Sequence, residues 1–282
     1  MSWENIPQQI NPVIFQIGNF KILWYSISYI LAFATIYLLL KNKVEKNKEF
    51  AIKLFKDKKP FDKIELLFVF CLIGLFIGAK LGFILFYNLP EFLENPLSSI
   101  TPFTNGKFTG FSGLSFHGAL IGIVAAGLLF CKKEKLSFIK LANFIIVTIP
   151  LGYFWGRLGN FANGELYGRM TKNPIGMCFP RAGDCIIGNR HPSQLYEAFG
   201  EGLLLFVLLI YVNKTKFGKR NLFSIWLIAY GSIRFLIEFF REPDIHLGTI
   251  FLFFSTGQIL CFFMTMLGFI LIVYPKKTKT RF

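Results

Sequence analysis

Residues 64–87 read IELLFVFCLIGLFIGAKLGFILFY, a stretch of 24 residues in which only Glu65 and Lys80 carry a charge. An α-helix needs about 20 mostly apolar residues to cross the hydrocarbon core of a bilayer, so this stretch predicts a membrane-spanning helix. The whole chain agrees with this, because 54% of its 282 residues are hydrophobic and 36 of them are Phe. Soluble domains seldom have such a composition. The sequence therefore predicts an integral membrane protein.

Six further apolar runs of similar length lie along the chain, which gives seven predicted spans. They predict an all-α, polytopic integral membrane protein with seven transmembrane helices. Neither an internal repeat nor a long polar linker divides the chain, so we expect one membrane-embedded domain over residues 1–282. The predicted spans are 20–40, 64–87, 113–131, 139–156, 194–213, 222–240 and 250–274.

The formal net charge of +15 comes from basic residues between the apolar runs rather than from a basic soluble domain, which argues against nucleic-acid binding. The clusters lie at 41–63, 132–138, 214–221 and 275–282, and the first holds nine lysines. Loops rich in Lys and Arg stay on the cytoplasmic side, where they face anionic lipid. We therefore expect a periplasmic (outer) N-terminus and a cytoplasmic C-terminus. The start, MSWENIPQQINPVIF, lacks a basic region, so no cleaved leader is expected.

The block 156–168, GRLGNFANGELYG, places polar side chains at the predicted outer end of the fourth span. A lone arginine at a helix end usually extends its head to the interface. Here Arg157 is followed closely by Asn160, Asn163 and Glu165, and unpaired polar groups in lipid cost several kcal/mol each. The block therefore indicates a site at the membrane surface.

A second polar row lies inside the sixth predicted span, where Tyr230, Arg234 and Glu238 share one helical face. Two interpretations remain open. Arg234 and Glu238 could form an ion pair that holds helices together, or Arg234 could face a cavity and bind an anion while Glu238 orients it. Arg157 and Arg234 near the outer leaflet could grip a phosphate, such as a phospholipid headgroup, with bidentate hydrogen bonds.

Other candidate residues each allow a structural interpretation. His117 begins an apolar helix and is either bonded to a backbone carbonyl or water, or a general base with a near-neutral pKa. Lys80 favours snorkelling to the interface, and Tyr25 could be an interfacial belt aromatic. Residues on one face at the start of the fifth span are expected either to line the same polar cavity or to satisfy partners within it. They are Gln194, Glu197 and Glu201.

The five cysteines show no metal-site spacing, and neither a metal nor a cofactor is expected. Cys178 and Cys185 share a predicted outer loop, where their separation allows a disulfide without requiring one.

These motifs, in this order, resemble bacterial phosphatidylglycerol–prolipoprotein diacylglyceryl transferases along nearly the whole chain. The block 156–168 is close to specific for that family. Departures are few: Ala119 stands where HGG is more usual, Ala162 where a larger aliphatic is expected, and Lys80 where arginine is typical. The matching pieces are LWY at 23–25, GAKLGFILFYN at 78–88, SFHG at 115–118, GRLGNFANGELYG at 156–168, HPSQLYE at 191–197, and the Tyr230–Arg234–Glu238 row with FFREPD.

The resemblance implies a multi-pass enzyme of the bacterial inner membrane that carries out the first step of lipoprotein maturation. Such an enzyme moves the diacylglyceryl group of phosphatidylglycerol to the lipobox cysteine thiol of a prolipoprotein, forms a thioether and releases glycerol phosphate. Its partners are therefore phosphatidylglycerol, prolipoprotein signal peptides and membrane lipids. The resemblance implies that His117 is the base and that Arg157 and Arg234 are essential. It also implies a dependence on Tyr25, Asn160, Glu165, Gly168, Tyr230 and Glu238.

Two other classes of membrane protein fit less well. A transporter or flippase predicts related halves and interrupted helices near the midplane, and no repeat is visible. An enzyme that attacks phosphorus would call for metal-binding carboxylates, and the carboxylates in the predicted spans are few and scattered.

Overall fold

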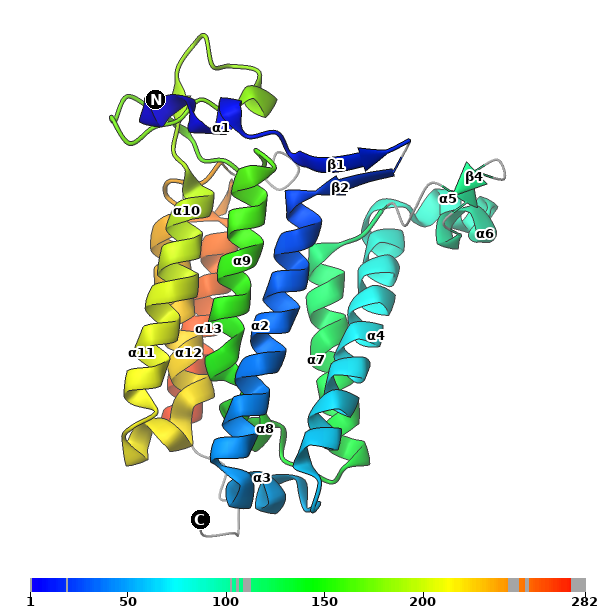
Figure 1. The fold of residues 1–282 in the computed structure, drawn as a ribbon, viewed down its shortest axis with the longest axis vertical. Coiled ribbons are helices and arrows are strands. Elements are labelled where there is room, and N and C mark those ends of the chain that lie inside the picture. The colour runs from blue at the N-terminus through cyan, green and yellow to red at the C-terminus, as the bar shows by residue number, and fades with distance from the viewer. Residues whose placement is uncertain are drawn as a thin grey trace. The chain divides into compact units, whose positions relative to one another are not determined.

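The computed structural model describes residues 2–18, 20–101, 103–104, 107–108, 113–242, 249–251 and 254–274. This part of the chain is mostly helical (Figure 1), as the sequence predicts. Within it, 6 helices are long and apolar enough to cross a membrane, which indicates a multi-pass membrane protein. These helices are Trp24–Lys46 (α2), Pro60–Tyr87 (α4), Phe116–Lys133 (α7), Phe138–Ala162 (α8 to α9), Ser193–Val212 (α10 to α11) and Thr256–Val273 (α13).

The sixth predicted span corresponds to α12 (Lys216–Ile237), a helix of 22 residues. Because α12 contains several polar and charged residues, it is not among the helices that are apolar enough to cross a membrane. The count of seven spans therefore stays a prediction. The orientation of the termini also stays a prediction. The basic tail 275–282 and residues 252–253 of the last predicted span lie outside the described residues.

The helices fall into two compact units, residues 41–141 and residues 1–40 with 142–282. In the first unit, α4 and α7 pack at backbone distance because glycines face each other along the contact. A Cβ on Gly122 would lie 2.0 Å from the carbonyl oxygen of Gly74, and one on Gly78 would lie 2.3 Å from that of Gly118. Gly118 is therefore part of this close contact. Shorter elements of this unit are α3 (Lys48–Phe55), α5 (Leu89–Glu94), α6 (Pro96–Ile100), β3 (Phe103–Thr104) and β4 (Lys107–Phe108).

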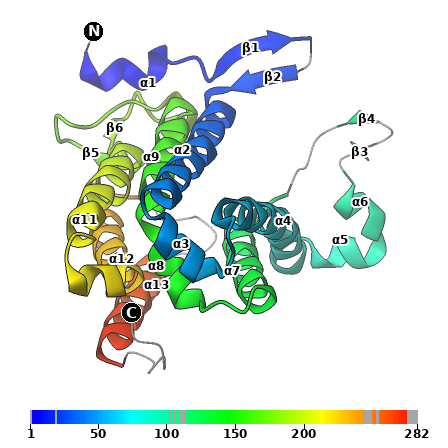
Figure 2. The same cartoon turned by 60° about the horizontal axis from the view of Figure 1, so that its bottom comes forward.

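The second unit contains the helices that carry the polar motifs. In it α9 (Ile149–Ala162) contacts the helix that runs from α10 (Ser193–Glu197) to α11 (Leu205–Val212), and α12 packs along α13 (Figure 2). Their apolar core lies at one end of the bundle and consists of Ile146, Val147, Leu205, Leu209 and Leu222. The middle of α2 packs on α9, where the indole Nε1 of Trp155 donates to Thr35 Oγ1 at 3.0 Å.

Several helix ends differ from the predicted spans, and one helix has an internal irregularity. The first helix begins at Trp24 rather than at residue 20, because β1 (Val13–Ile17) and β2 (Phe20–Leu23) form a hairpin before it. The fourth span continues beyond residue 156 to Ala162, since polar partners satisfy the side chains of its last turns. The fifth contains a π-helical segment at Ala198–Leu204.

The loop between α9 and α10 is tied down by several short elements. Here β5 (Met170–Thr171) pairs with β6 (Asn189–Arg190), and a 3₁₀ turn covers Pro180–Ala182. Cys178 and Cys185 form a disulfide with their Cα atoms 5.0 Å apart, which resolves the alternative that the sequence leaves open. The N-terminal segment contacts this loop, because the backbone N–H of Cys178 donates to the carbonyl of Glu4. This segment contains a 3₁₀ turn at Trp3–Asn5 and the short helix α1 (Ile6–Gln9). At the other end of the chain, β7 (Thr249–Phe251) and β8 (Phe254–Ser255) precede α13.

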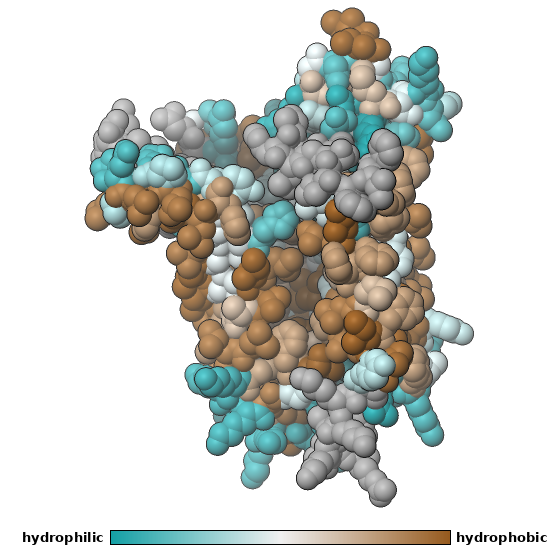
Figure 3. All heavy atoms as spheres, turned by 180° about the vertical axis from the view of Figure 1, so that it is seen from behind, coloured by the Kyte–Doolittle hydropathy of each residue, from teal (hydrophilic) through white to brown (hydrophobic). Residues whose placement is uncertain are grey.

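Apolar side chains face outward along the helices, and hydrophilic side chains gather at their ends (Figure 3). On α4 and α13, for example, Phe76 and Phe263 are exposed. A soluble protein rarely exposes apolar surface on this scale, whereas lipid covers it in a membrane protein.

Candidate active site

Arg157 lies near the end of α9 and is held by partners on two helices. Its Nε donates to the hydroxyl of Tyr153 at 2.7 Å, one turn earlier on the same helix. Its Nη1 donates to Asn160 Oδ1 at 3.3 Å, and Nε lies 2.6 Å from Glu197 Oε2 on α10. The guanidinium therefore has a fixed orientation within the bundle.

Arg234 on α12 is also surrounded by carboxylates. Its Nη1 lies 2.8 Å from Glu197 Oε1 and 3.6 Å from Glu201 Oε1, and its Nη2 lies 2.9 Å from Glu238 Oε2. Ser255 Oγ, which also caps α13, donates to the other oxygen of Glu238 at 2.9 Å. The ion pair between Arg234 and Glu238 is thus present, and Glu238 is held in turn by Ser255.

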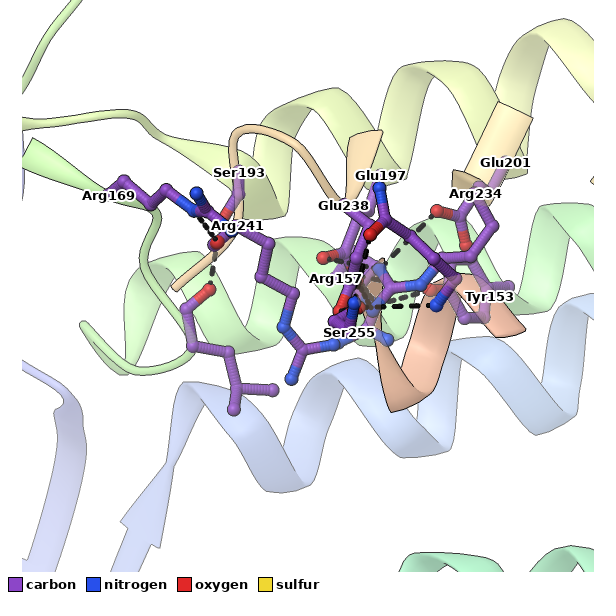
Figure 4. A network of polar contacts seen from close by, with 12 residues as sticks. Tyr153, Arg157, Arg169, Ser193, Glu197, Glu201, Arg234, Glu238, Arg241 and Ser255 are labelled. Atoms are coloured by element: carbon purple, nitrogen blue, oxygen red, sulfur yellow. Dashed lines mark hydrogen bonds and ion pairs between the residues drawn. The ribbon is translucent and has the colours of Figure 1, made fainter. Parts of the chain in front are cut away.

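Glu197 joins the two arginines, because each of its oxygens lies against one guanidinium (Figure 4). Its side chain is 0% exposed, as is that of Glu201. Charges buried to this extent persist only when they are paired. The two arginines with Glu197, Glu201 and Glu238 form one buried cluster, which we call the arginine–glutamate cluster.

The block 156–168 folds around Glu165 next to this cluster. Asn160 Nδ2 donates to Glu165 Oε1 at 2.9 Å, and Asn163 Nδ2 donates to Oε2 at 3.0 Å. Gln194 Nε2 donates to the main-chain carbonyl of Glu165 at 2.7 Å. Since Asn160 also accepts from Arg157, a continuous chain of hydrogen bonds links Glu165 to the guanidinium.

Two tyrosines from the predicted set lie in the same unit. The Tyr230 ring stacks on Trp226 at 5.3 Å and meets the Tyr153 ring edge-on at 6.1 Å. The Tyr25 hydroxyl pairs with the Tyr29 hydroxyl at 2.9 Å. Gly159 brings this part of α2 close to the block, because a Cβ on it would lie 1.9 Å from Ser28 Oγ.

The outer loop contains a separate charged group around Arg190. Its Nε donates to Asp184 Oδ2 at 2.9 Å, its Nη1 lies 3.1 Å from Glu242, and its guanidinium lies over the Tyr167 ring. Hydrogen bonding to Arg190 lowers the pKa of Asp184 from its usual value. Partial burial lowers the pKa of neighbouring His191, whose Nδ1 lies 3.0 Å from the Tyr196 hydroxyl.

Most of the predicted site residues lie together in the second unit, whereas His117 belongs to the first unit and Gly168 to the outer loop. His117 lies in the first turn of α7 in the other unit, where it is exposed and meets the Phe116 ring edge-on. Its role as the base stays a prediction. Gly168 lies in the outer loop and donates its N–H to the His191 carbonyl at 2.8 Å. The structure groups the remaining residues around or beside the arginines. They are Tyr25, Arg157, Asn160, Glu165, Tyr230, Arg234 and Glu238.

Two residues to which the sequence alone assigns no role belong to this arrangement, although Arg241 lies within the FFREPD piece. Tyr153 bonds Arg157 from the preceding turn, a contact that i, i+4 spacing could have indicated. Arg241 follows α12, and its side chain extends towards Arg157 (Figure 4). No local pattern indicates this approach, because it depends on contacts between segments far apart in the sequence. Among the described residues, no group of three or more His, Cys, Asp or Glu side chains could hold a metal ion.

Comparison with known proteins agrees with these residues. The sequence model of the prolipoprotein diacylglyceryl transferase family matches residues 12–274. A phosphatidylglycerol–prolipoprotein diacylglyceryl transferase of Chlorobaculum tepidum is 46% identical over 98% of this chain and 93% of its own length. Proteins of the same name are 41% identical in Ehrlichia canis (95% of this chain, 97% of its own length) and 39% in Rickettsia bellii (96% and 97%). By both measures, this chain belongs to the prolipoprotein diacylglyceryl transferase family.

Proposed function

We propose that this protein transfers the diacylglyceryl group of phosphatidylglycerol to the lipobox cysteine of prolipoproteins. The bond from the lipid's glyceryl carbon to the phosphate oxygen breaks, a thioether forms at that carbon, and glycerol phosphate leaves. The reaction takes place in the bacterial inner membrane, in a chain of seven spans with a periplasmic N-terminus and a cytoplasmic C-terminus. Family membership and the exposed apolar helices support this proposal.

The observation that carries the proposal is the position of Glu197. Its two oxygens lie 2.6 Å from Arg157 and 2.8 Å from Arg234, so the two guanidiniums already hold one two-oxygen anion between them. A phosphodiester presents a similar pair of charged oxygens. The lipid phosphate would take the place of Glu197 between the arginines, which would stabilise the charge that grows on the leaving phosphate.

The remaining residues have supporting roles in the proposed reaction. His117 takes the thiol proton, since only a few per cent of a thiol with pKa near 8.5 is thiolate at neutral pH. Asn160 and Glu165 hold Arg157, while Glu238 holds Arg234. Tyr25 and Tyr230 contact the lipid headgroup beside them. Gly168 holds the outer loop in place, where its N–H donates to the His191 carbonyl.

The test uses the purified full-length chain, phosphatidylglycerol labelled in its acyl chains, and a lipobox peptide with either cysteine or serine at the acceptor position. We expect label on the cysteine peptide alone. Label on neither peptide, or equally on both, would show that the proposed reaction is wrong.

A further inference from the structure

Gly168 and Arg169 of the outer loop bind the main chain of the segment that follows α12, next to the ion pair between Arg190 and Glu242. Arg169 donates its backbone N–H to the carbonyl of Phe240 at 2.9 Å, and its side-chain Nε donates to the carbonyl of Arg241 at 2.9 Å. Gly168 and Arg241 form an isolated antiparallel bridge beside these bonds. Residues 168–169 therefore bind the main chain on both sides of the peptide bond between Phe240 and Arg241.

The absence of a side chain at Gly168 makes this contact possible. A Cβ at this position would lie 2.4 Å from the Phe240 carbonyl oxygen and 2.8 Å from the Cβ of His191. On the other side, the N–H of His191 donates to the Arg169 carbonyl at 3.0 Å. Residues 168–169 are thus held between the segment before α10 and the segment after α12.

The fastened segment directs an arginine at the cluster. The Arg241 side chain runs from beside Arg169 and Ser193 towards Arg157 (Figure 4). A long side chain can hold its guanidinium in one place only if its main chain is fixed, because any movement of the Cα also moves the guanidinium.

We infer that Arg169 is a positioning residue for the transfer reaction and that it acts through Arg241. The inference rests on the proposed function, in which the arginines hold a lipid phosphate. The Arg169 side chain donates a hydrogen bond to a main-chain carbonyl. Its contribution is therefore to hold the Arg241 main chain in position, and not to add a positive charge to the site. Arg241 then adds a third guanidinium to the edge of the arginine–glutamate cluster.

Lys172 provides a matched control, because it is an exposed cation on the same loop. In the labelled-lipid assay we expect Arg169→Gln to lower kcat/KM about tenfold, the effect of losing roughly one charge-assisted hydrogen bond. Arg169→Lys keeps the charge without the Nε donor and should fall equally. Lys172→Gln removes the same charge and should stay within about twofold of the unchanged protein.

A double-mutant cycle identifies the route of the effect. In an Arg241→Ala background, Arg169→Gln should cause no further loss in kcat/KM. An undiminished loss in that background, full activity of Arg169→Lys, or equal losses in Arg169→Gln and Lys172→Gln would each overturn the inference. If Arg169→Gln does not fold, the same cycle is run with Arg169→Lys. Failure of the proposed function is distinct, since the unchanged protein would then transfer no label.

Discussion

Glu197 is a buried carboxylate held between two cations. It is fully buried, and its two oxygens contact two cations that come from different helices. Removing one partner of a buried ion pair leaves an uncompensated charge, which is more costly than the pair is worth. Glu197 therefore contributes to folding as well as to the proposed site.

Replacement of Glu197 by Gln should destabilise the protein by about 3 kcal/mol, because Arg157 and Arg234 lose their shared counter-ion. Thermal unfolding in detergent measures the effect. Glu242→Gln is the control: its side chain is 46% exposed and pairs with Arg190 at the surface, so it should change stability by less than about 1 kcal/mol. Equal losses from the two substitutions would contradict the central place of Glu197.

The two arginines should be required for transfer. Arg157→Ala and Arg234→Ala should each lower kcat at least about a hundredfold, as removal of a preorganised donor does elsewhere. Turnover that survives both substitutions would rule out the phosphate clamp.

His117→Ala tests the proposed base separately. Near-normal transfer by this variant at neutral pH would exclude His117 as the base.

At the residue scale, the sequence indicates which residues belong to the candidate site better than it indicates which of them contact each other. Arg157 and Arg234 are recognisable because each stands in a compact polar motif inside an apolar stretch. The bridge between them through Glu197 joins α9, α10 and α12, and Arg241 approaches by tertiary contact alone. Such geometry depends on helix packing, which local pattern does not encode.

At the element scale, the contact between α4 and α7 should tolerate no side chain at its centre. Gly122→Val should destabilise the protein by about 2 kcal/mol, because its Cβ would lie 2.0 Å from the Gly74 carbonyl oxygen. That oxygen belongs to the main chain, so it cannot move aside as the end of a flexible side chain could. Gly127→Ala on the same helix should be nearly neutral, since its nearest neighbour lies 3.4 Å away. Thermal unfolding separates the two, and equal stability would contradict the packing described.

The outer loop should loosen in mild acid. Burial lowers the pKa of His191, so its stabilising contribution is complete above the unfolded value of about 6.5 and is lost as the pH falls through the lower folded pKa. The pKa of Asp184 is also lowered, but its contribution is lost only in stronger acid, below about 3.9. Hydrogen exchange of residues 164–192, corrected for intrinsic rates, should show less protection at pH 5 than at pH 7. His191→Gln should remove most of that difference, and a difference that persists would exclude His191 as its cause.

Element types are more predictable than element ends in this chain. Long apolar runs indicate helices clearly, because their length matches a bilayer. Residues 20–23 are as apolar as the helix that follows, so composition does not reveal that they pair with residues 13–17. Likewise, α9 continues to Ala162 only because its polar side chains find partners.

At the scale of the whole molecule, the proposed orientation places the loop at 164–192 outside and the lysine-rich segment 41–63 inside. Single cysteines at Ile187 and Lys48 test this in intact cells, with the free Cys71, Cys131 and Cys261 replaced by Ser. A membrane-impermeant thiol reagent should label Ile187→Cys, whose side chain is 80% exposed, and spare Lys48→Cys until the cells are opened. The reverse pattern would invert the topology.

The carboxylates around the two arginines have a consequence for what the resting enzyme attracts. Because Glu197 already contacts both guanidiniums, a phosphate that binds there as proposed would compete with an internal ligand at high effective concentration. Small anions such as inorganic phosphate bring too little binding energy for that exchange, whereas a lipid adds the energy of its acyl chains. In the proposed reaction glycerol phosphate loses those chains on transfer, so the returning carboxylate would favour its release. On this proposal Glu197 would act as a built-in competitor of the product, held in contact with both arginines.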